Sequence, residues 1–186
     1  AEAVVKRVPE TVPEEIAKGA HFKLDQAAPI ATVDELPDYD AIIFGTATYM
    51  GNVSAAFQAF AEQTGRRCQQ GTWRDKVAAG FTNSGSKSGD KLNALVSLSV
   101  FAAQHHMHWV NLGLGPGWNH SAASEDELNR LGFWLGAAAA TDVDANPDEV
   151  HPSDVATCEH LGRRVADVTR QLIAGRAVAQ AVTAGA

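Results

Sequence analysis

Short apolar runs alternate with helical patterns through the middle of the chain. Residues 40–45 and 76–81 are nearly continuous in small and apolar side chains, the pattern of strands buried on both faces of a parallel sheet. Each run is followed by a loop of small residues and then by a helical pattern, over 54–63 and 90–104 respectively. A further strand is predicted over 108–112. This alternation predicts an open parallel α/β sheet with helices on both faces.

The first part of the chain predicts less regular structure. Residues 3–8 are rich in β-branched side chains and stop before Pro9, which predicts a strand that ends where a backbone donor is lost. A short helix is predicted over 32–36, with Thr32 as its cap and Glu35 three residues later.

The last part of the chain predicts one long helix after an irregular region. Residues 113–152 have weak periodicity, and a stretch of this length is usually functional. A helix is predicted to begin at Pro152 and to end at Gly175. We therefore expect a single domain over 1–175 and a frayed helical or disordered tail over 176–186.

Composition and charge narrow the possible functions. Fifteen Lys and Arg against 22 Asp and Glu give a net charge of −7, which disfavours broad binding to nucleic acid phosphates. Apolar runs are far shorter than the ~20 residues that cross a bilayer, so no membrane span is predicted. Cys68 and Cys158 lie too far apart in the sequence to indicate a disulfide framework or a zinc knuckle, which favours a reducing, cytoplasmic location.

Two loops follow the predicted central strands and are candidates for a binding site. Ligands of open parallel sheets bind beyond the carboxyl ends of the strands, where residues 46–52 and 82–89 are expected. The first loop offers small residues and Tyr49, against which a flat ring could lie. The second loop is rich in serine and glycine and precedes a helix, so its backbone N–H groups could bind a polar ring or an anion. On spacing alone, both loops could equally be plain surface connectors.

The order of these segments resembles a known family. The matching residues are Val4–Thr11, Tyr39–Thr46, Thr48 with Gly51 and Asn52, and Gln63–Gly65. These segments look like the flavodoxin-like NAD(P)H:quinone oxidoreductases, also called tryptophan-repressor-binding-protein-like flavoproteins. The resemblance is close through about residue 113 and weak after it.

This resemblance implies a doubly wound, parallel, five-stranded flavodoxin-like sheet of order 2-1-3-4-5, with FMN as cofactor. It implies electron transfer from NADH or NADPH to a quinone or similar small acceptor, and a homodimer or homotetramer. His106 matches a histidine near the flavin and is the candidate catalytic residue. The residues that match the two flavin loops are Thr48, Tyr49, Met50, Gly51, Asn52, Ser84, Gly85, Ser86, Lys87, Ser88 and Gly89.

Several residues depart from the family pattern. The family has Pro-Thr-Arg-Phe-Gly-Asn where this chain has Ala47–Asn52, so an arginine and an aromatic residue are lost at the flavin edge. Cys68 stands where members carry a tryptophan at the substrate site. The sequence also opens on what corresponds to strand two, so the first strand and its phosphate-binding loop are expected to be missing from this sequence. Their loss would weaken phosphate binding.

Other interpretations stay open at this point. A flavodoxin-type electron carrier, an NAD(P)H-dependent FMN reductase and a domain that has lost its cofactor all fit the same fold. The His105, His106 and His108 cluster has no carboxylate or thiol at ligand spacing, and adjacent helical residues face different directions, so no metal site is predicted.

Overall fold

A computed structural model describes residues 1–19 and 26–184 of the chain. Two long parallel strands form the centre of its sheet. β1 (Ala41–Tyr49) pairs with β3 (Val77–Ser84), in a register that runs from Ala41 opposite Val77 to Ala47 opposite Asn83. Both predicted central strands are confirmed, and both extend further toward their carboxyl ends than the apolar runs indicate. The added residues include Thr46, Thr48 and Thr82, whose β-branched side chains suit a strand.

Two short strands share the other edge of β3. β4 (His108–Trp109) pairs with the beginning of β3, and β5 (Ala137–Ala140) pairs with its end, both in parallel. The strand predicted over 108–112 is therefore shorter than expected. The chain leaves the sheet, and the Leu112 amide donates instead to the Trp134 carbonyl, at 3.0 Å.

A hairpin closes the carboxyl end of β1. β2 (Asn52–Val53) turns back antiparallel onto Thr48 and Tyr49. Positive φ angles at Met50 (49°) and Gly51 (73°) give the turn the twist that two-residue hairpins need.

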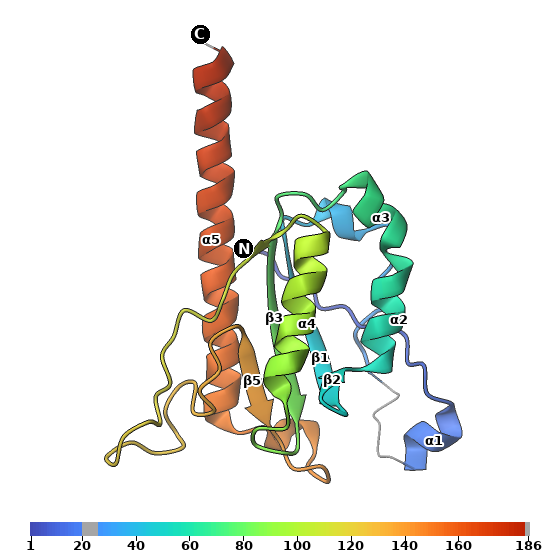
Figure 1. Cartoon of the computed structure of the whole chain (residues 1–186), viewed down its shortest axis with the longest axis vertical. Coiled ribbons are helices and arrows are strands. Elements are labelled where there is room, and N and C mark those ends of the chain that lie inside the picture. Colours follow the sequence, from blue (N-terminus) through green and yellow to red (C-terminus); the bar gives the residue numbers. More distant parts are fainter. Residues whose placement is uncertain (20–25, 185–186) are drawn as a thin grey trace.

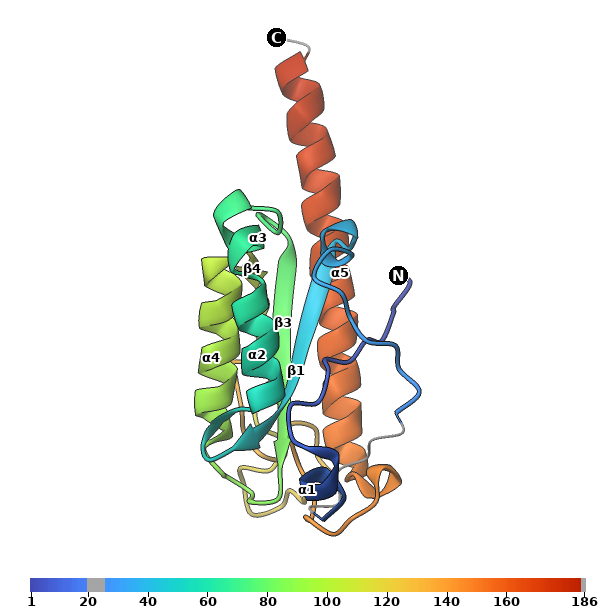
Figure 2. The same ribbon diagram turned by 90° about the vertical axis from the view of Figure 1, so that its right-hand side faces the viewer.

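Helices cover both faces of the sheet, as the alternation predicts (Figures 1 and 2). One face carries α2 (Ala55–Gln63), α3 (Gly65–Gln70) and α4 (Lys91–Gln104). The other face carries α5 (Pro152–Ala184). No helix among the described residues has the length and hydropathy to cross a membrane.

Each face has its own apolar core. The first core lies under α2 and α4 and contains Phe44, Phe57, Trp73, Leu95 and Leu98. The second core lies under α5 and contains Val77, Ala79, Leu112, Leu161 and Val165. The short elements are α1 (Glu14–Gly19), η1 (Leu36–Asp38), whose Leu36 joins the first core, and η2 (Pro147–Glu149).

Two predictions for the first part of the chain were wrong. The strand expected over 3–8 is reduced to a single parallel bridge between Arg7 and Ile30. In the order 2-1-3-4-5, strand two lies at the edge of the sheet and pairs only with strand one. Residues 3–8 correspond to strand two, and no strand one is present among the described residues to pair with them. Over 32–36 the chain forms a turn, followed by η1; Glu35 still accepts from the Thr32 amide at 2.8 Å, as in a capping box.

The end predicted for the closing helix was also wrong. α5 continues through Gly175 to Ala184, so most of the expected tail is helical. This last part projects past the sheet (Figure 1), and the side chains of Val178 and Val182 are exposed. The division into a domain over 1–175 and a tail over 176–186 stays a prediction.

Candidate functional site

The two predicted loops lie at the same end of the sheet. Because β1 and β3 are adjacent and parallel, their carboxyl ends meet at one edge, at the lower end of the molecule in Figure 1. The hairpin of residues 49–52 follows β1, and the loop of residues 84–90 follows β3 and leads into α4. The structure therefore brings together the predicted residues of 48–52 and 84–89.

The tip of the hairpin presents apolar surface to solvent. Met50 is fully exposed, and about half of Tyr49 is exposed. Partial burial, followed by the charge of Glu10, raises the pKa of the Tyr49 phenol above its usual value, which keeps the ring neutral. An exposed methionine and a neutral aromatic ring are suited to contact a flat, largely apolar ligand.

Helix α4 holds this hairpin in place. Asn93 Nδ2 donates to the Gly51 carbonyl at 2.7 Å, and Ser97 Oγ donates to Asn52 Oδ1 at 3.0 Å. Asn93 and Ser97 are four residues apart and share one face of the helix. Sequence reasoning missed both residues, although a polar pair at i and i+4 in a mostly apolar helix was a visible signal.

A hydroxyl pair links the two strands beneath the loops. Thr48 Oγ1 and Thr82 Oγ1 are 2.7 Å apart and buried. At the entry to α2, Ser54 Oγ accepts from the Phe57 amide and caps the helix, while the Ser54 amide donates to Thr46 Oγ1. These bonds fix where the hairpin leaves the sheet.

The second loop depends on glycine. Gly89 (φ 54°) and Asp90 (φ 55°) are consecutive left-handed residues at the start of α4. A Cβ at Gly89 would lie 2.7 Å from Ser84 Oγ and 3.1 Å from the Ser86 carbonyl oxygen. A side chain at this position would therefore force the loop to change shape.

Two buried polar atoms at this end of the sheet have no hydrogen-bond partner among residues 1–19 and 26–184. They are Asn83 Oδ1, near the end of β3, and Thr141 Oγ1, directly after β5. A buried polar group without a hydrogen-bond partner lowers the free energy of unfolding by about 1–3 kcal/mol, so a ligand that supplies the partner would bind favourably. The isoalloxazine ring of FMN carries hydrogen-bond donors and acceptors on one edge. The polar atoms, the exposed apolar hairpin and the glycine-dependent loop fit that group.

His106 lies elsewhere. It lies between the end of α4 and the start of β4, whereas the two loops lie at the other end of that helix. A helix of 14 residues is about 21 Å long, so the structure does not bring His106 together with the loops. Its catalytic role stays a prediction from the resemblance, and we do not include it in the site.

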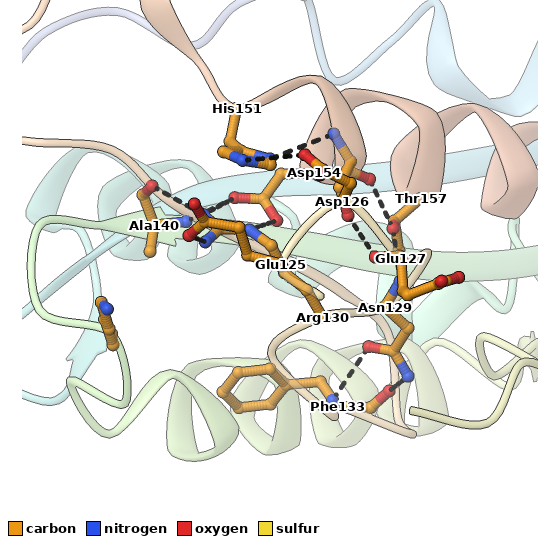
Figure 3. A network of polar contacts seen from close by, with 12 residues as sticks. Glu125, Asp126, Glu127, Asn129, Arg130, Phe133, Ala140, His151, Asp154 and Thr157 are labelled. Carbon is orange, nitrogen blue, oxygen red and sulfur yellow. Dashed lines mark hydrogen bonds and ion pairs between the residues drawn. The ribbon is translucent and has the colours of Figure 1, made fainter. Parts of the chain in front are cut away.

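A buried ion pair lies against the last residue of β5, at the start of α5 (Figure 3). Arg130 donates to both carboxylate oxygens of Asp154 at 2.8 Å, and this bonding raises the pKa of the Arg130 guanidinium. The backbone of Ala140, next to Thr141, joins the same network: its amide donates to Asp154 and its carbonyl accepts from Arg130. The network ties β5 to α5.

Asn129 organises the neighbouring part of the region over 113–136 (Figure 3). Its side chain donates to the carbonyls of Leu114 and Phe133 and accepts from the Phe133 amide, while its own amide donates to Thr157 Oγ1. Sequence reasoning found neither Asn129 nor the ion pair, because this region has only weak periodicity.

His105, next to His106, belongs to the core. Its ring stacks on Trp73 with centroids 4.1 Å apart, and its Nε2 lies 2.8 Å from Thr64 Oγ1. Burial, followed by the charge of His106, lowers the pKa of His105 to about 4. No group of three or more His, Cys, Asp or Glu residues suited to a metal ion occurs within the described ranges.

Comparison with known proteins places these features in context. The family model described as NADPH-dependent FMN reductase matches residues 8–141. A protein named flavodoxin FldP from Pseudomonas aeruginosa is 40% identical over 144 residues, which cover 77% of this chain and 78% of the relative. A protein named NAD(P)H dehydrogenase (quinone) from Methylocella silvestris is 37% identical over 172 residues, covering 92% and 84% respectively.

A solved structure is similar as well. The crystal structure of the flavodoxin, WrbA-like protein from Agrobacterium tumefaciens matches with a TM-score of 0.59 and 33% sequence identity. The match covers 85% of this chain and 87% of that one.

Proposed function

Because the chain belongs to the NADPH-dependent FMN reductase family, we propose that it is an FMN-dependent oxidoreductase that transfers electrons from NADH or NADPH to a quinone or similar small acceptor. The observation that carries this proposal is the match to relatives named NAD(P)H dehydrogenase (quinone), which are 36 to 38% identical over 90 to 92% of this chain. The fold class predicted from the sequence, flavodoxin-like, is confirmed by the same comparisons.

The two loops are the residues that we assign to the cofactor. Residues 48–52 would border the ring on one side and residues 84–89 on the other. When bound, FMN supplies the electron chemistry, since it can accept hydride from a reduced nicotinamide and pass two electrons to an acceptor. The protein supplies binding, orientation and electrostatics.

Particular side chains have distinct tasks in this arrangement. Met50 and Tyr49 cover the apolar surface of the flavin ring and exclude water from that surface. Asn83 Oδ1 and Thr141 Oγ1 offer hydrogen bonds to polar atoms of the ring, since neither atom has another partner in the part of the chain that the structure describes. Asn93 keeps the hairpin at a fixed distance from α4 through the Gly51 carbonyl.

A direct assay tests the proposal. The purified full chain, incubated with excess FMN and freed of unbound cofactor, is expected to be yellow and to oxidise NADH or NADPH in the presence of benzoquinone. A chain that stays colourless and leaves NADH and NADPH unoxidised would contradict the proposed function.

Gly89→Ala is expected to weaken FMN binding about tenfold. A left-handed alanine costs about 1–2 kcal/mol, and a penalty of 1.4 kcal/mol on the binding-competent loop lowers affinity by a factor of ten. The measurement is the FMN dissociation constant, from quenching of FMN fluorescence.

Gly162→Ala is the matched control for this change. Gly162 lies within α5, and a Cβ there would meet nothing within 4 Å. We expect an unchanged FMN dissociation constant. Equal affinities in the two variants would show that the loop of residues 84–89 does not hold the cofactor.

A one-electron carrier is the second candidate function, because a relative at 40% identity is named a flavodoxin. A reductive titration separates the two. A well-populated one-electron state favours the carrier, whereas direct oxidation of NADPH by the holoprotein favours the reductase. A reductase of free FMN would turn over faster with FMN than with benzoquinone.

Self-association belongs to the same proposal, as a homodimer or homotetramer. Leu92, Val96 and Val100 form an exposed apolar stripe at i, i+4 and i+8 on α4. Apolar stripes of this kind are typical of subunit contacts. We also propose a cytoplasmic location, which suits the two free cysteines, Cys68 and Cys158.

A further inference from the structure

A buried lysine lies beneath the second loop. Lys91 is 0% exposed and occupies the first turn of α4. Its Nζ donates to the carbonyl oxygens of Ser86 and Lys87, the latter at 3.1 Å. No carboxylate lies within ion-pair distance of this ammonium among residues 1–19 and 26–184.

Two properties make this placement costly for the folded protein. Burial removes the ammonium from water and lowers the pKa of Lys91 below its usual value. The positive end of the helix dipole repels a cation in the first turn. A carboxylate, Asp154, attracts the charge from further away, but it is already paired with Arg130. Energetically unfavourable groups of this kind concentrate at functional sites.

The local charge balance is positive. The cations Lys91 and Arg130 and the single anion Asp154 leave one buried positive charge in excess. Glu125 lies 3.9 Å from Arg130, but its side chain is 55% exposed and largely screened by water. The site therefore favours a ligand that gains negative charge.

The bonds from Lys91 also set the direction of the loop amides. In a trans peptide, the N–H and C=O groups point in opposite directions. Because the carbonyls of Ser86 and Lys87 point inward to Lys91, the amides of Lys87 and Ser88 point away from it, toward the outer side of the loop. Neither amide has a backbone acceptor in the described part of the chain.

We propose that Lys91 is a positioning residue for FMN, which turns the amides of Lys87 and Ser88 toward the cofactor and whose buried charge favours the reduced, negatively charged cofactor over the oxidised one. This inference rests on the proposed function, because it assumes that the loop of residues 84–89 holds FMN. Lys91 orients groups that contact the ring and is not itself a catalytic residue.

The test is Lys91→Met in the full chain reconstituted with FMN. The variant keeps the length of the side chain and removes its charge. We expect the ratio of affinities for reduced and oxidised FMN to fall about tenfold, which lowers the midpoint potential by about 30 mV for a two-electron couple. Oxidised FMN is expected to bind several-fold more weakly because the amides are no longer fixed.

Protein stability separates this role from a merely structural one. Burying an unpaired charge costs folding free energy, so the apo form of Lys91→Met should unfold at the same urea concentration as the wild type or a higher one. Lys91→Gln serves as a second variant if Lys91→Met does not fold, with the same expected fall in potential. Lys18→Met removes an exposed lysine and should change neither potential nor affinity.

The outcomes are distinct. A folded variant with wild-type potential and wild-type affinity would overturn the role of Lys91, as would loss of apo stability with an unchanged potential. Failure of the wild-type chain to bind FMN would instead overturn the proposed function on which the inference rests.

Discussion

Asp154→Asn is expected to lower the free energy of unfolding by about 3–5 kcal/mol, because it removes one partner of a buried ion pair. The side chains of Arg130 and Asp154 are only 5% and 2% exposed, and the guanidinium would keep its charge with no carboxylate bonded to it. Lys91 interacts electrostatically with both groups, so the variant would also leave two neighbouring buried cations without their shared carboxylate. Urea denaturation followed by circular dichroism measures the change.

The double variant Arg130→Met with Asp154→Asn tests whether the cost comes from the unpaired charge. We expect it to be at least about 1 kcal/mol less destabilised than the sum of the two single variants, since neither member of the pair is left behind as an unpaired charge. Asp167→Asn breaks an exposed pair with Arg170 and should cost less than about 1 kcal/mol. Additive single variants, or equal costs at the buried and exposed pairs, would contradict this account.

Stability is expected to fall in acid because His105 must become charged. The pKa of His105 is about 4 in the folded protein against an ordinary value of 6.5, so the unfolded chain binds the proton more tightly. The contribution is therefore fully present above pH 6.5 and is lost progressively as the pH falls from 6.5 toward 4. It amounts to about 3 kcal/mol.

His105→Phe isolates this contribution. Phenylalanine keeps a ring against Trp73, and Thr64 Oγ1 keeps its bond to the Ala61 carbonyl. Denaturation midpoints of the variant should depend less on pH than those of the wild type between pH 6.5 and 4. The exposed His120→Gln should keep the wild-type dependence. Parallel pH profiles for His105→Phe and wild type would refute the prediction.

The central strands and helices were predictable because their signals are local. The apolar runs before Thr46 and Thr82 identify β1 and β3 without knowledge of the rest of the fold. Adjacent parallel strands then place both following loops at one edge, so the candidate site could be located from sequence alone. The residue roles within it stay predictions.

Contacts between distant parts of the chain could not be predicted in the same way. Asn93 and Gly51 are 42 positions apart, and Arg130 and Asp154 are 24 apart, with no pattern that pairs them. For His106, the resemblance predicted a contact that the structure does not show. Resemblance placed it near the flavin, whereas the length of α4 carries it to the other end of the sheet.

One edge of β3 is shared by two short strands, β4 and β5, and the segment between them can vary in length among relatives. The chain leaves the sheet after β4 and re-enters at β5, and the bond from Leu112 to Trp134 closes the base of the excursion. Closing a longer or shorter loop on a fixed base changes the free energy only slightly. Insertions can therefore accumulate between Leu112 and Trp134 on either side of Asn129 and Arg130, whose buried bonds to Thr157 and Asp154 hold this segment to α5.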